Sequence, residues 1–292
     1  MLGKTIINYM ILLTIVPGRK PSIKFIGDIA VVRIPKELDR LEDEIGRQVL
    51  TRYPHIRSVV RFYGISGEMR IPCAKLIAGS DTVTIHSEYG CRFKLDVLKL
   101  MFSLGNSRER LRLAGKVGAG EIVVDMFAGI GQFTIPVGLK ASPKHIYSFE
   151  INPEAYRYLV ENIRLNKLEE RVTAVNDDSR NSPSYNLEGR ADRVIMGYFK
   201  GTIDYLPTAL KLAKPEGAVI HFHELAGREE GWRKLLDECD KVAKICGYTI
   251  KLLEYKMVKS YSPTLSHWAL DLLAILRPRF QPSSNLTQNP AS

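Results

Sequence analysis

The stretch from Glu121 to Asn152 constrains the fold of this chain more than any other part of the sequence. It begins with Ile122–Val124, an apolar run short enough for a buried parallel strand, and Asp125 closes that strand. The turn that follows contains Gly129 and Gly131 and has almost no side chains, so a ligand can approach its backbone. A helix comes next and points its N-terminal N–H groups into the same crevice. The pattern predicts one nucleotide-binding unit of an α/β sheet.

A second strand over residues 146–149 ends in Glu150, where a carboxylate typically accepts hydrogen bonds from the two hydroxyls of a ribose. Both dinucleotides and S-adenosylmethionine (SAM) use this arrangement. A dinucleotide fingerprint requires a third glycine, but Thr134 occupies that position. Asp125 and Phe127 just before the glycines also suit SAM better. The sequence therefore favours SAM, and the alternative is a glycine turn that only connects a strand to a helix.

The charge of the chain suggests a polyanionic partner. The sequence has 292 residues, of which 45% are hydrophobic and 25% charged, as in an ordinary globular protein. Its net charge is +10 and its pI is near 9.4. Such an excess of Lys and Arg suits nucleic acid first of all, although a basic surface can also serve solubility alone.

The cysteines and the N-terminal stretch both favour a reducing compartment. The four cysteines show neither Cys-x-x-Cys spacing nor a histidine at zinc-ligand spacing, so we expect free thiols. Residues 6–16 are mostly apolar but too short to cross a bilayer, and no small-residue cleavage site follows them. We interpret residues 1–20 as an N-terminal extension, either an extra strand or helix or the result of an upstream start. A cytoplasmic protein without a membrane segment is expected.

Residues 21–100 read as a small α+β domain. A hairpin is predicted over residues 23–34, with its turn at Gly27-Asp28. Pro35 then opens a helix over residues 36–51, whose apolar positions keep helical spacing. Further short strands are expected at residues 59–62, 74–78 and 82–86.

A basic helix is expected over residues 103–118, directly before the cofactor strand. It carries four basic side chains and a single acid, Glu109. Leu111 and Leu113 are predicted to give it one buried side. Such a run can be a solvated helix face. The alternative is that it lays Ser103 and an arginine over the SAM pocket and offers its other basic groups to phosphates.

Residues 101–277 are predicted to form one Rossmann-like domain, and residues 278–292 a flexible tail. Strands alternate with helices after Glu150, and the last two strands are expected to form an antiparallel pair. These strands are predicted at residues 172–176, 191–197, 218–224, 249–258 and 266–274, and the helices at 153–166, 202–214 and 228–246. The acidic turn at 177–179 commonly meets an adenine amino group, although it can also be a plain Asp-rich turn.

His221 and His223 straddle Phe222, so they face the same side of their strand. A metal pair is conceivable from that placement, but the nearby acid, Glu224, faces the other way. The favoured interpretation is that one of these strand-end histidines lies near the substrate, and that no metal is bound.

Several motifs together resemble a family of tRNA-modifying enzymes. The motifs are Phe102-Ser-x-Gly-Asn-x-x-Glu-Arg110, the glycine turn, Phe-Glu-Ile-Asn-Pro153 and Gly64-x-x-Gly-Glu-x-Arg-x-Pro72. The resemblance covers about residues 22 to 276. One branch of this family makes 1-methylguanosine next to the anticodon. The other moves the 3-amino-3-carboxypropyl group of SAM onto a tricyclic guanosine derivative at the same position of phenylalanine tRNA, in wybutosine synthesis.

The end of the strand at residues 191–197 distinguishes the two branches. The methyltransferase branch carries Asn-Leu-Pro there, and its Asn contacts the target base. This chain instead has Met196-Gly197-Tyr198-Phe199, which resembles the aminocarboxypropyl branch. The pair Leu104-Gly105 also replaces the Pro-Arg of one methyltransferase subgroup. Two alternatives stay open, namely methylation of tRNA guanosine and RNA binding without catalysis.

The resemblance implies a SAM-dependent methyltransferase fold, SAM as the donor and the anticodon stem-loop of tRNA-Phe as the partner of a monomer. It implies that Ser103 and Arg110 hold SAM, the arginine through the methionine carboxylate, and that Glu150 takes the ribose. It also places Asp178 and Ser179 at the adenine. The predicted cofactor-binding residues are Ser103, Arg110, Phe127, Gly129, Gly131, Glu150, Ile151, Asp178 and Ser179. The catalytic residue is unknown, with Tyr198, His221 and His223 as candidates.

Overall fold

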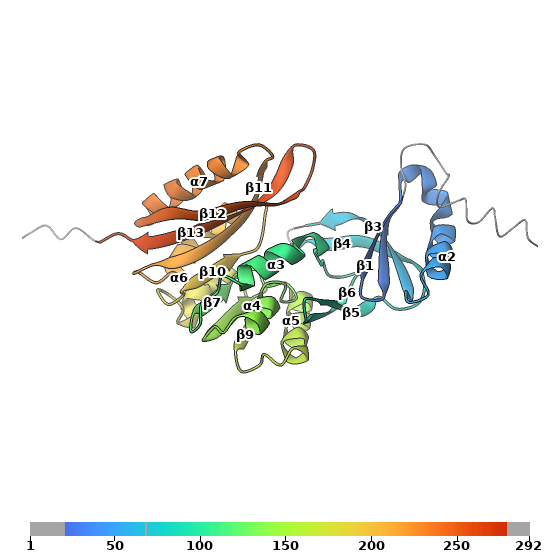
Figure 1. Cartoon of the computed structure of the whole chain (residues 1–292), viewed down its shortest axis with the longest axis horizontal. Helices are drawn as coiled ribbons and strands as arrows, with labels where there is room; N and C mark the ends of the chain where they lie inside the picture. Colours follow the sequence, from blue (N-terminus) through green and yellow to red (C-terminus); the bar gives the residue numbers. More distant parts are fainter. Residues whose placement is uncertain (1–20, 68, 279–292) are drawn as a thin grey trace, which may run out of the picture.

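The computed structural model describes residues 21–67 and 69–278. The predicted N-terminal extension lies outside this range, as does the predicted tail from residue 279 on. A small four-stranded sheet with one covering helix lies beside a larger seven-stranded sheet with helices on both faces (Figure 1). Among the described residues, no helix is long and apolar enough to cross a membrane.

The N-terminal sheet has the strand order β1-β2-β3-β4, with β1 (Ser22–Ile26), β2 (Ile29–Arg33), β3 (Ser58–Ser66) and β4 (Ile71–Ala78). The predicted hairpin is confirmed, because β1 and β2 pair antiparallel around Gly27. The single helix predicted after Pro35 is divided into a 3-10 turn, η1 (Lys36–Leu41), and α2 (Glu42–Arg52). Arg61 of β3 pairs with Asp39 of the first part and Glu42 of the second, so both pack against the sheet.

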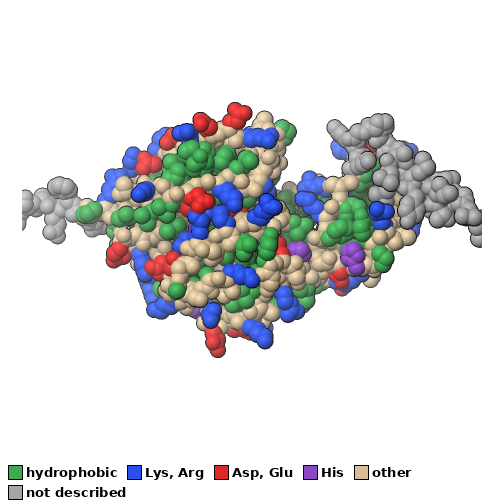
Figure 2. Space-filling model, in the orientation of Figure 1, with side chains coloured by type: hydrophobic (Ala, Val, Ile, Leu, Met, Phe, Trp, Pro, Cys, Tyr) green, Lys and Arg blue, Asp and Glu red, His purple; other side chains and the backbone are tan. Residues whose placement is uncertain are grey.

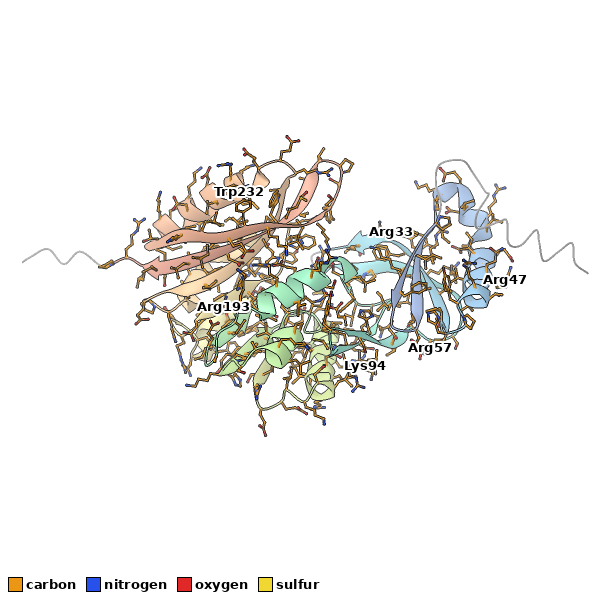
Figure 3. All side chains as sticks on the ribbon, viewed as in Figure 1. Arg33, Arg47, Arg57, Lys94, Arg193 and Trp232 are labelled. Atoms are coloured by element: carbon orange, nitrogen blue, oxygen red, sulfur yellow. The ribbon has the colours of Figure 1, made fainter. Side chains whose placement is uncertain are left out.

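A separate hairpin, β5 (Val83–Glu88) and β6 (Cys91–Asp96), joins the two sheets. The backbone N–H of Lys94 donates to Oδ1 of Asn162 at 2.6 Å, and that of Arg92 donates to Asn166 at 3.0 Å, so β6 is held against α5 (Pro153–Leu165) (Figure 3). Phe93 and Leu95 of β6 share one hydrophobic cluster with residues of both sheets. The two parts of the molecule are therefore joined by a continuous core.

The seven-stranded sheet has the order β12-β13-β11-β10-β7-β8-β9. The five strands from β9 to β11 run parallel, and β13 and β12 continue the sheet antiparallel, which confirms the predicted Rossmann-like arrangement. The strands are β7 (Ile122–Asp125), β8 (His145–Phe149), β9 (Val172–Val175), β10 (Arg193–Met196), β11 (Ala218–Gly227), β12 (Tyr248–Ser260) and β13 (Leu265–Leu276).

Helices cover both faces of this sheet. One hydrophobic cluster packs α3 (Ser107–Ala114), α4 (Thr134–Lys140) and α5 against one face. A second cluster packs α6 (Leu206–Leu212) and α7 (Gly231–Ile245) against the other. Short 3-10 turns complete the domain at η2 (Leu104–Asn106), η3 (Ser179–Tyr185) and η4 (Thr202–Tyr205).

The buried face of α3 differs from the prediction. Leu113 is fully buried, but Leu111 is 39% exposed, so the predicted pair does not form one buried side. Charged side chains turn inward instead, and Glu109 and Arg110 are each 1% exposed. Both charges are compensated by ion pairs. Arg110 pairs with Glu88 of β5, and Arg112 bridges Glu109 to Asp271 of β13. In Figure 2, basic side chains gather near the middle of one face, between the two sheets.

Candidate active site

The glycine turn after β7 has the conformation that its sequence predicts. Gly129 and Gly131 have φ values of 56° and 95°, in the left-handed region that side chains other than glycine rarely adopt. A Cβ on Gly131 would also lie 2.9 Å from Cγ1 of Ile135. Asp125 is fully buried beneath the turn and accepts a hydrogen bond from the Thr134 hydroxyl at 2.8 Å. The turn is thus fixed by contacts below it, and its upper surface is left open.

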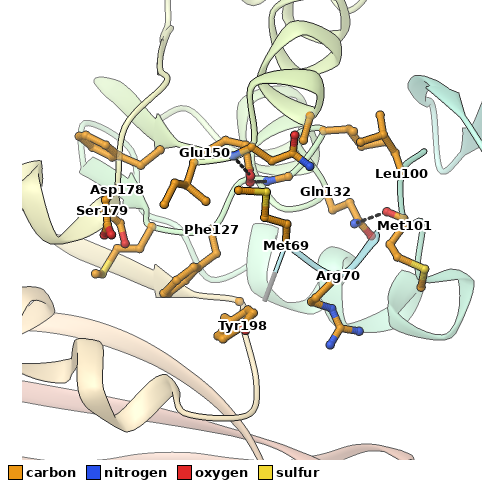
Figure 4. A pocket seen from close by; sticks show the side chains of 18 of the residues that line it. Met69, Arg70, Leu100, Met101, Phe127, Gln132, Glu150, Asp178, Ser179 and Tyr198 are labelled. Atoms are coloured by element: carbon orange, nitrogen blue, oxygen red, sulfur yellow. Dashed lines mark hydrogen bonds between the residues drawn. The ribbon is translucent and has the colours of Figure 1, made fainter. Parts of the chain in front are cut away.

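Glu150 lies across from this turn, at the end of β8. One oxygen of its carboxylate accepts the N–H of Gly129 and the other accepts the N–H of Asn152, each at 2.8 Å. Burial raises the pKa of this carboxyl, and the two backbone N–H groups oppose the rise. Each oxygen retains acceptor capacity, so the side chain is held ready for a pair of neighbouring hydroxyls. Figure 4 shows Glu150 in the middle of one wall of the pocket.

A pocket opens over these residues, beside the glycine turn and Glu150. Most of the predicted SAM-binding residues line it, namely Phe127, Gly129, Glu150, Ile151, Asp178 and Ser179. Of the catalytic candidates, only Tyr198 does so. Gly131 belongs to the turn but does not line the pocket, and Ser103 and Arg110 bond to the lining residue Gln132.

The two ends of the pocket differ in chemistry. At one end, Asp178 accepts the backbone N–H of Arg180 at 2.9 Å and pairs with its guanidinium, which lowers the pKa of the Asp178 carboxyl. Aromatic rings flank this end, since Phe127 stacks on Tyr198 with centroids 5.2 Å apart and meets Tyr205 edge-on at 4.9 Å. A planar, largely apolar base suits such a surface.

At the opposite end of the pocket, Gln132 connects three residues by hydrogen bonds. Its Oε1 accepts the N–H of Ser103 and Nη1 of Arg110, each at 3.2 Å, and its Nε2 donates to the carbonyl of Met101 at 3.1 Å (Figure 4). Nε of Arg110 donates to Glu88 at 2.6 Å. Arg110 therefore forms part of the support behind this wall. The sequence pattern gave no separate indication of Gln132, although it directly follows the second glycine of the turn.

Arg70 is a second residue that the sequence reasoning missed. It lies in the turn between β3 and β4 with φ of 55°, and it lines the pocket together with Met69. Its guanidinium lies 4.3 Å from the centre of the Phe199 ring, and burial lowers its pKa. The Gly64-x-x-Gly-Glu-x-Arg-x-Pro72 motif marks this turn, so an arginine inside a glycine-rich hairpin was the available signal. The small sheet thus contributes directly to the pocket.

His221 and His223 face the same side of β11, as predicted, but both are fully buried and neither lines the pocket. His221 lies between Asp271, 2.6 Å from its Nδ1, and Arg193, 2.7 Å from its Nε2. Nδ1 of His223 lies 3.0 Å from Nε2 of His267. The placement of these side chains assigns them to a buried polar network. No three His, Cys, Asp or Glu side chains in the described ranges are grouped so that they could hold a metal ion.

This network predicts that stability falls as the pH drops from 7 to 5. Burial lowers the pKa of His223 to about 3 and that of His267 to about 2. In the unfolded chain both histidines take up protons below about pH 6.5. Below that pH, each therefore lowers the free energy of unfolding by about 1.4 kcal/mol per pH unit. Asp125, whose pKa burial raises to about 6, opposes part of this loss below pH 6. Urea unfolding at pH 7, 6 and 5 measures the slope. A protein with both histidines changed to Gln should show a shallower one, and equal slopes would contradict the assignment.

The sequence matches the TRM5/TYW2 methyltransferase domain over residues 84–251 and the TYW2 N-terminal domain over residues 22–82. The chain belongs to the TRM5/TYW2 family. The two matches meet between β4 and β5, so the family assigns the β5–β6 hairpin to the methyltransferase part. The hydrogen bonds from β6 to α5 agree with that assignment.

Two relatives within the TRM5/TYW2 family are named tRNA(Phe) (4-demethylwyosine(37)-C(7)) aminocarboxypropyltransferase. The one from Pyrococcus horikoshii is 39% identical over 247 residues, which cover 85% of this chain and 87% of the relative. The one from Methanocaldococcus jannaschii is 41% identical over 246 residues, which cover 84% and 95%. The solved structure of P. horikoshii TYW2 in complex with MeSAdo resembles this chain with a TM-score of 0.78, at 36% identity, and the match covers 90% of this chain and 93% of that one.

Proposed function

We propose that this chain transfers the 3-amino-3-carboxypropyl group of SAM to the 4-demethylwyosine base next to the anticodon of tRNA-Phe. The names of the two archaeal relatives support this reaction. The net charge of +10 suits a polyanionic RNA. We further propose that the chain acts as a cytoplasmic monomer on the anticodon stem-loop, and that residues 21–100 form its RNA-associated domain, with the β5–β6 hairpin at the junction with the methyltransferase part.

The end of β10 carries this proposal. Gly197 and Tyr198 line the pocket there, where the methyltransferase branch is expected to present an amide to the target base. Gly197 also leaves no room for a larger residue, because an added Cβ would lie 2.6 Å from the ring of Phe133. The amide is therefore replaced by an aromatic surface in which Tyr198 stacks on Phe127. A flat tricyclic acceptor suits that surface better than an amide-read guanine.

The pocket residues fit SAM in a consistent order. Glu150 suits the ribose hydroxyls, and Asp178 with Ser179 suits the adenine. SAM supplies a sulfonium with activated carbon–sulfur bonds, so the contribution of the chain is chiefly to position donor and acceptor. The acceptor carbon forms a bond to the γ-carbon of the amino acid arm, and the γ-carbon–sulfur bond breaks. The electron pair stays on sulfur as methylthioadenosine leaves, and the proton of the acceptor carbon passes to solvent.

Identification of the adenosine product tests this proposal. Purified enzyme incubated with SAM and tRNA-Phe carrying 4-demethylwyosine should release methylthioadenosine in step with RNA modification. Release of S-adenosylhomocysteine would show methyl transfer and overturn the proposal. Tight binding of both substrates without either product would indicate an RNA-binding protein. tRNA-Phe that carries unmodified guanosine is the matched control, and it should yield neither product.

A further inference from the structure

Lys259 lies one residue before the end of β12, and its ammonium group reaches the strand-to-helix connection that precedes the cofactor strand. Nζ of Lys259 donates to Oγ of Ser103 at 2.7 Å. Its stem passes Gly105, where an added Cβ would lie 3.2 Å from Cδ of the lysine. The Leu104-Gly105 pair of this chain therefore leaves space for Lys259 to reach Ser103, one of the residues predicted to hold SAM.

The charges nearest to Lys259 are all positive. Burial, together with the charges of Lys24, Arg70 and Arg110, lowers its pKa to about 8. Among residues 21–67 and 69–278, neither Lys259 nor Arg70 has a carboxylate within ion-pair distance, unlike Arg110, which pairs with Glu88. Partly buried cations without a counter-charge are unfavourable. An oxyanion bound beside these cations would supply the missing counter-charge.

Arg110 also has a buried nitrogen atom without a hydrogen-bond acceptor in the described part of the chain. The side chain is 1% exposed, and its Nε and Nη1 are fully engaged by Glu88, the Ser103 carbonyl and Gln132. Its Nη2 is buried as well, yet it has no hydrogen-bond partner among the described residues. A buried guanidinium nitrogen without an acceptor costs free energy, so this atom also calls for an oxyanion at the same place.

These groups lie next to the pocket, at the end away from the adenine. Ser103 and Arg110 both bond to Gln132, and Gln132, Met101 and Arg70 line that end. Figure 4 places Asp178 and Ser179 at one side of the pocket, Glu150 in the middle, and Gln132 with Arg70 at the other side. A SAM molecule held at Glu150 with its adenine beside Asp178 extends its amino acid arm toward the cation cluster.

We propose that Lys259 is a positioning residue that, together with Nη2 of Arg110, binds the carboxylate of the amino acid arm of SAM. This inference rests on the proposed function and deepens it. With Glu150 holding the ribose and Lys259 holding the carboxylate, SAM is fixed at both ends and the γ-carbon between them is presented to the acceptor. An RNA phosphate is the other available oxyanion, but the cluster adjoins the end of the pocket that Gln132, Met101 and Arg70 line, which favours the arm of SAM.

A comparison of two ligands tests this role. SAM and methylthioadenosine share the adenosine and the sulfur, but only SAM carries the carboxylate. Calorimetric titration of Lys259→Met should show SAM binding weakened by about tenfold or more, with methylthioadenosine affinity changed by less than about twofold. Lys259→Arg should recover most of the affinity for SAM. Lys251→Met, on an exposed lysine of the same strand, is the matched control and should bind both ligands as the unchanged protein does.

Two results would overturn the proposal. Equal weakening of both ligands would show that Lys259 only maintains local structure. Unchanged binding of both ligands combined with weaker tRNA binding would assign the lysine to an RNA phosphate. These titrations require no turnover. A loss of the arm-specific effect therefore leaves the proposed transfer reaction intact, and a failure of transfer in the product assay leaves the titrations interpretable.

Discussion

Replacement of Glu150 by alanine is expected to weaken SAM binding by about a hundredfold, because two hydrogen bonds to a charged carboxylate are lost at roughly 1.5 kcal/mol each. The carboxylate is already oriented by the N–H groups of Gly129 and Asn152. Its removal also leaves the N–H of Gly129 without its acceptor beside the pocket. Calorimetric titration with SAM measures the affinity, and a thermal melt shows whether the variant is folded.

Glu154→Ala is the matched control for this experiment. Glu154 lies four residues after Glu150 and does not line the pocket, and its carboxylate pairs with Lys99 and Arg157. Its replacement should leave the affinity for SAM within about twofold, because surface ion pairs contribute little. A Glu150→Ala protein that is folded and binds SAM as tightly as the control would remove the ribose assignment.

Replacement of Glu224 by alanine is expected to lower the transfer rate by about a hundredfold while SAM affinity changes by less than about threefold. The Glu224 carboxylate accepts the backbone N–H groups of Lys200, Gly201 and Thr202 at 2.6 to 2.9 Å. These bonds hold a loop in which Lys200 has φ of 80°, a left-handed conformation that costs free energy. The same loop begins with Tyr198, so its release displaces the proposed acceptor surface.

The two effects of Glu224→Ala are separable because Glu150 and Asp178 follow other strands. Single-turnover transfer measures the rate, and titration measures SAM binding. Glu229→Ala, an exposed acid just after the same strand, is the control and should retain normal transfer. A Glu224→Ala protein that transfers at the normal rate would show that the loop is held by other contacts. A parallel loss of SAM affinity would show that the loop supports the donor and not the acceptor.

The sequence was sufficient to predict the part of the site that a continuous segment builds. The strand, the glycine turn and Glu150 lie within one short stretch, and strand-to-helix geometry fixes their relative placement. Arg70 and Lys259 were not predicted in this way. Arg70 lines the pocket from the hairpin of the small sheet, and Lys259 reaches Ser103 from the far end of an antiparallel edge strand. Only the packing of the two sheets brings them together.

The surroundings of the histidines and of α3 also depend on residues that are distant in sequence. Alternation along β11 correctly placed His221 and His223 on one face, but it could not reveal that Asp271 and His267 of the adjacent strand β13 are their partners. Periodicity in α3 likewise assigned the inward positions to leucines. Its charged residues turned inward because Asp271 and Glu88, both distant in sequence, supply their partners. Ion pairs between distant segments override a local hydrophobic pattern when they compensate the burial of charge.

Transfer from doubly labelled SAM tests the central claim most directly. SAM that carries one label in the methyl carbon and another in the carboxyl carbon is incubated with the enzyme and tRNA-Phe containing 4-demethylwyosine. The carboxyl label is expected to enter the RNA, while the methyl label stays with released methylthioadenosine. Methyl label in the RNA, with the carboxyl label left in solution, would contradict the claim.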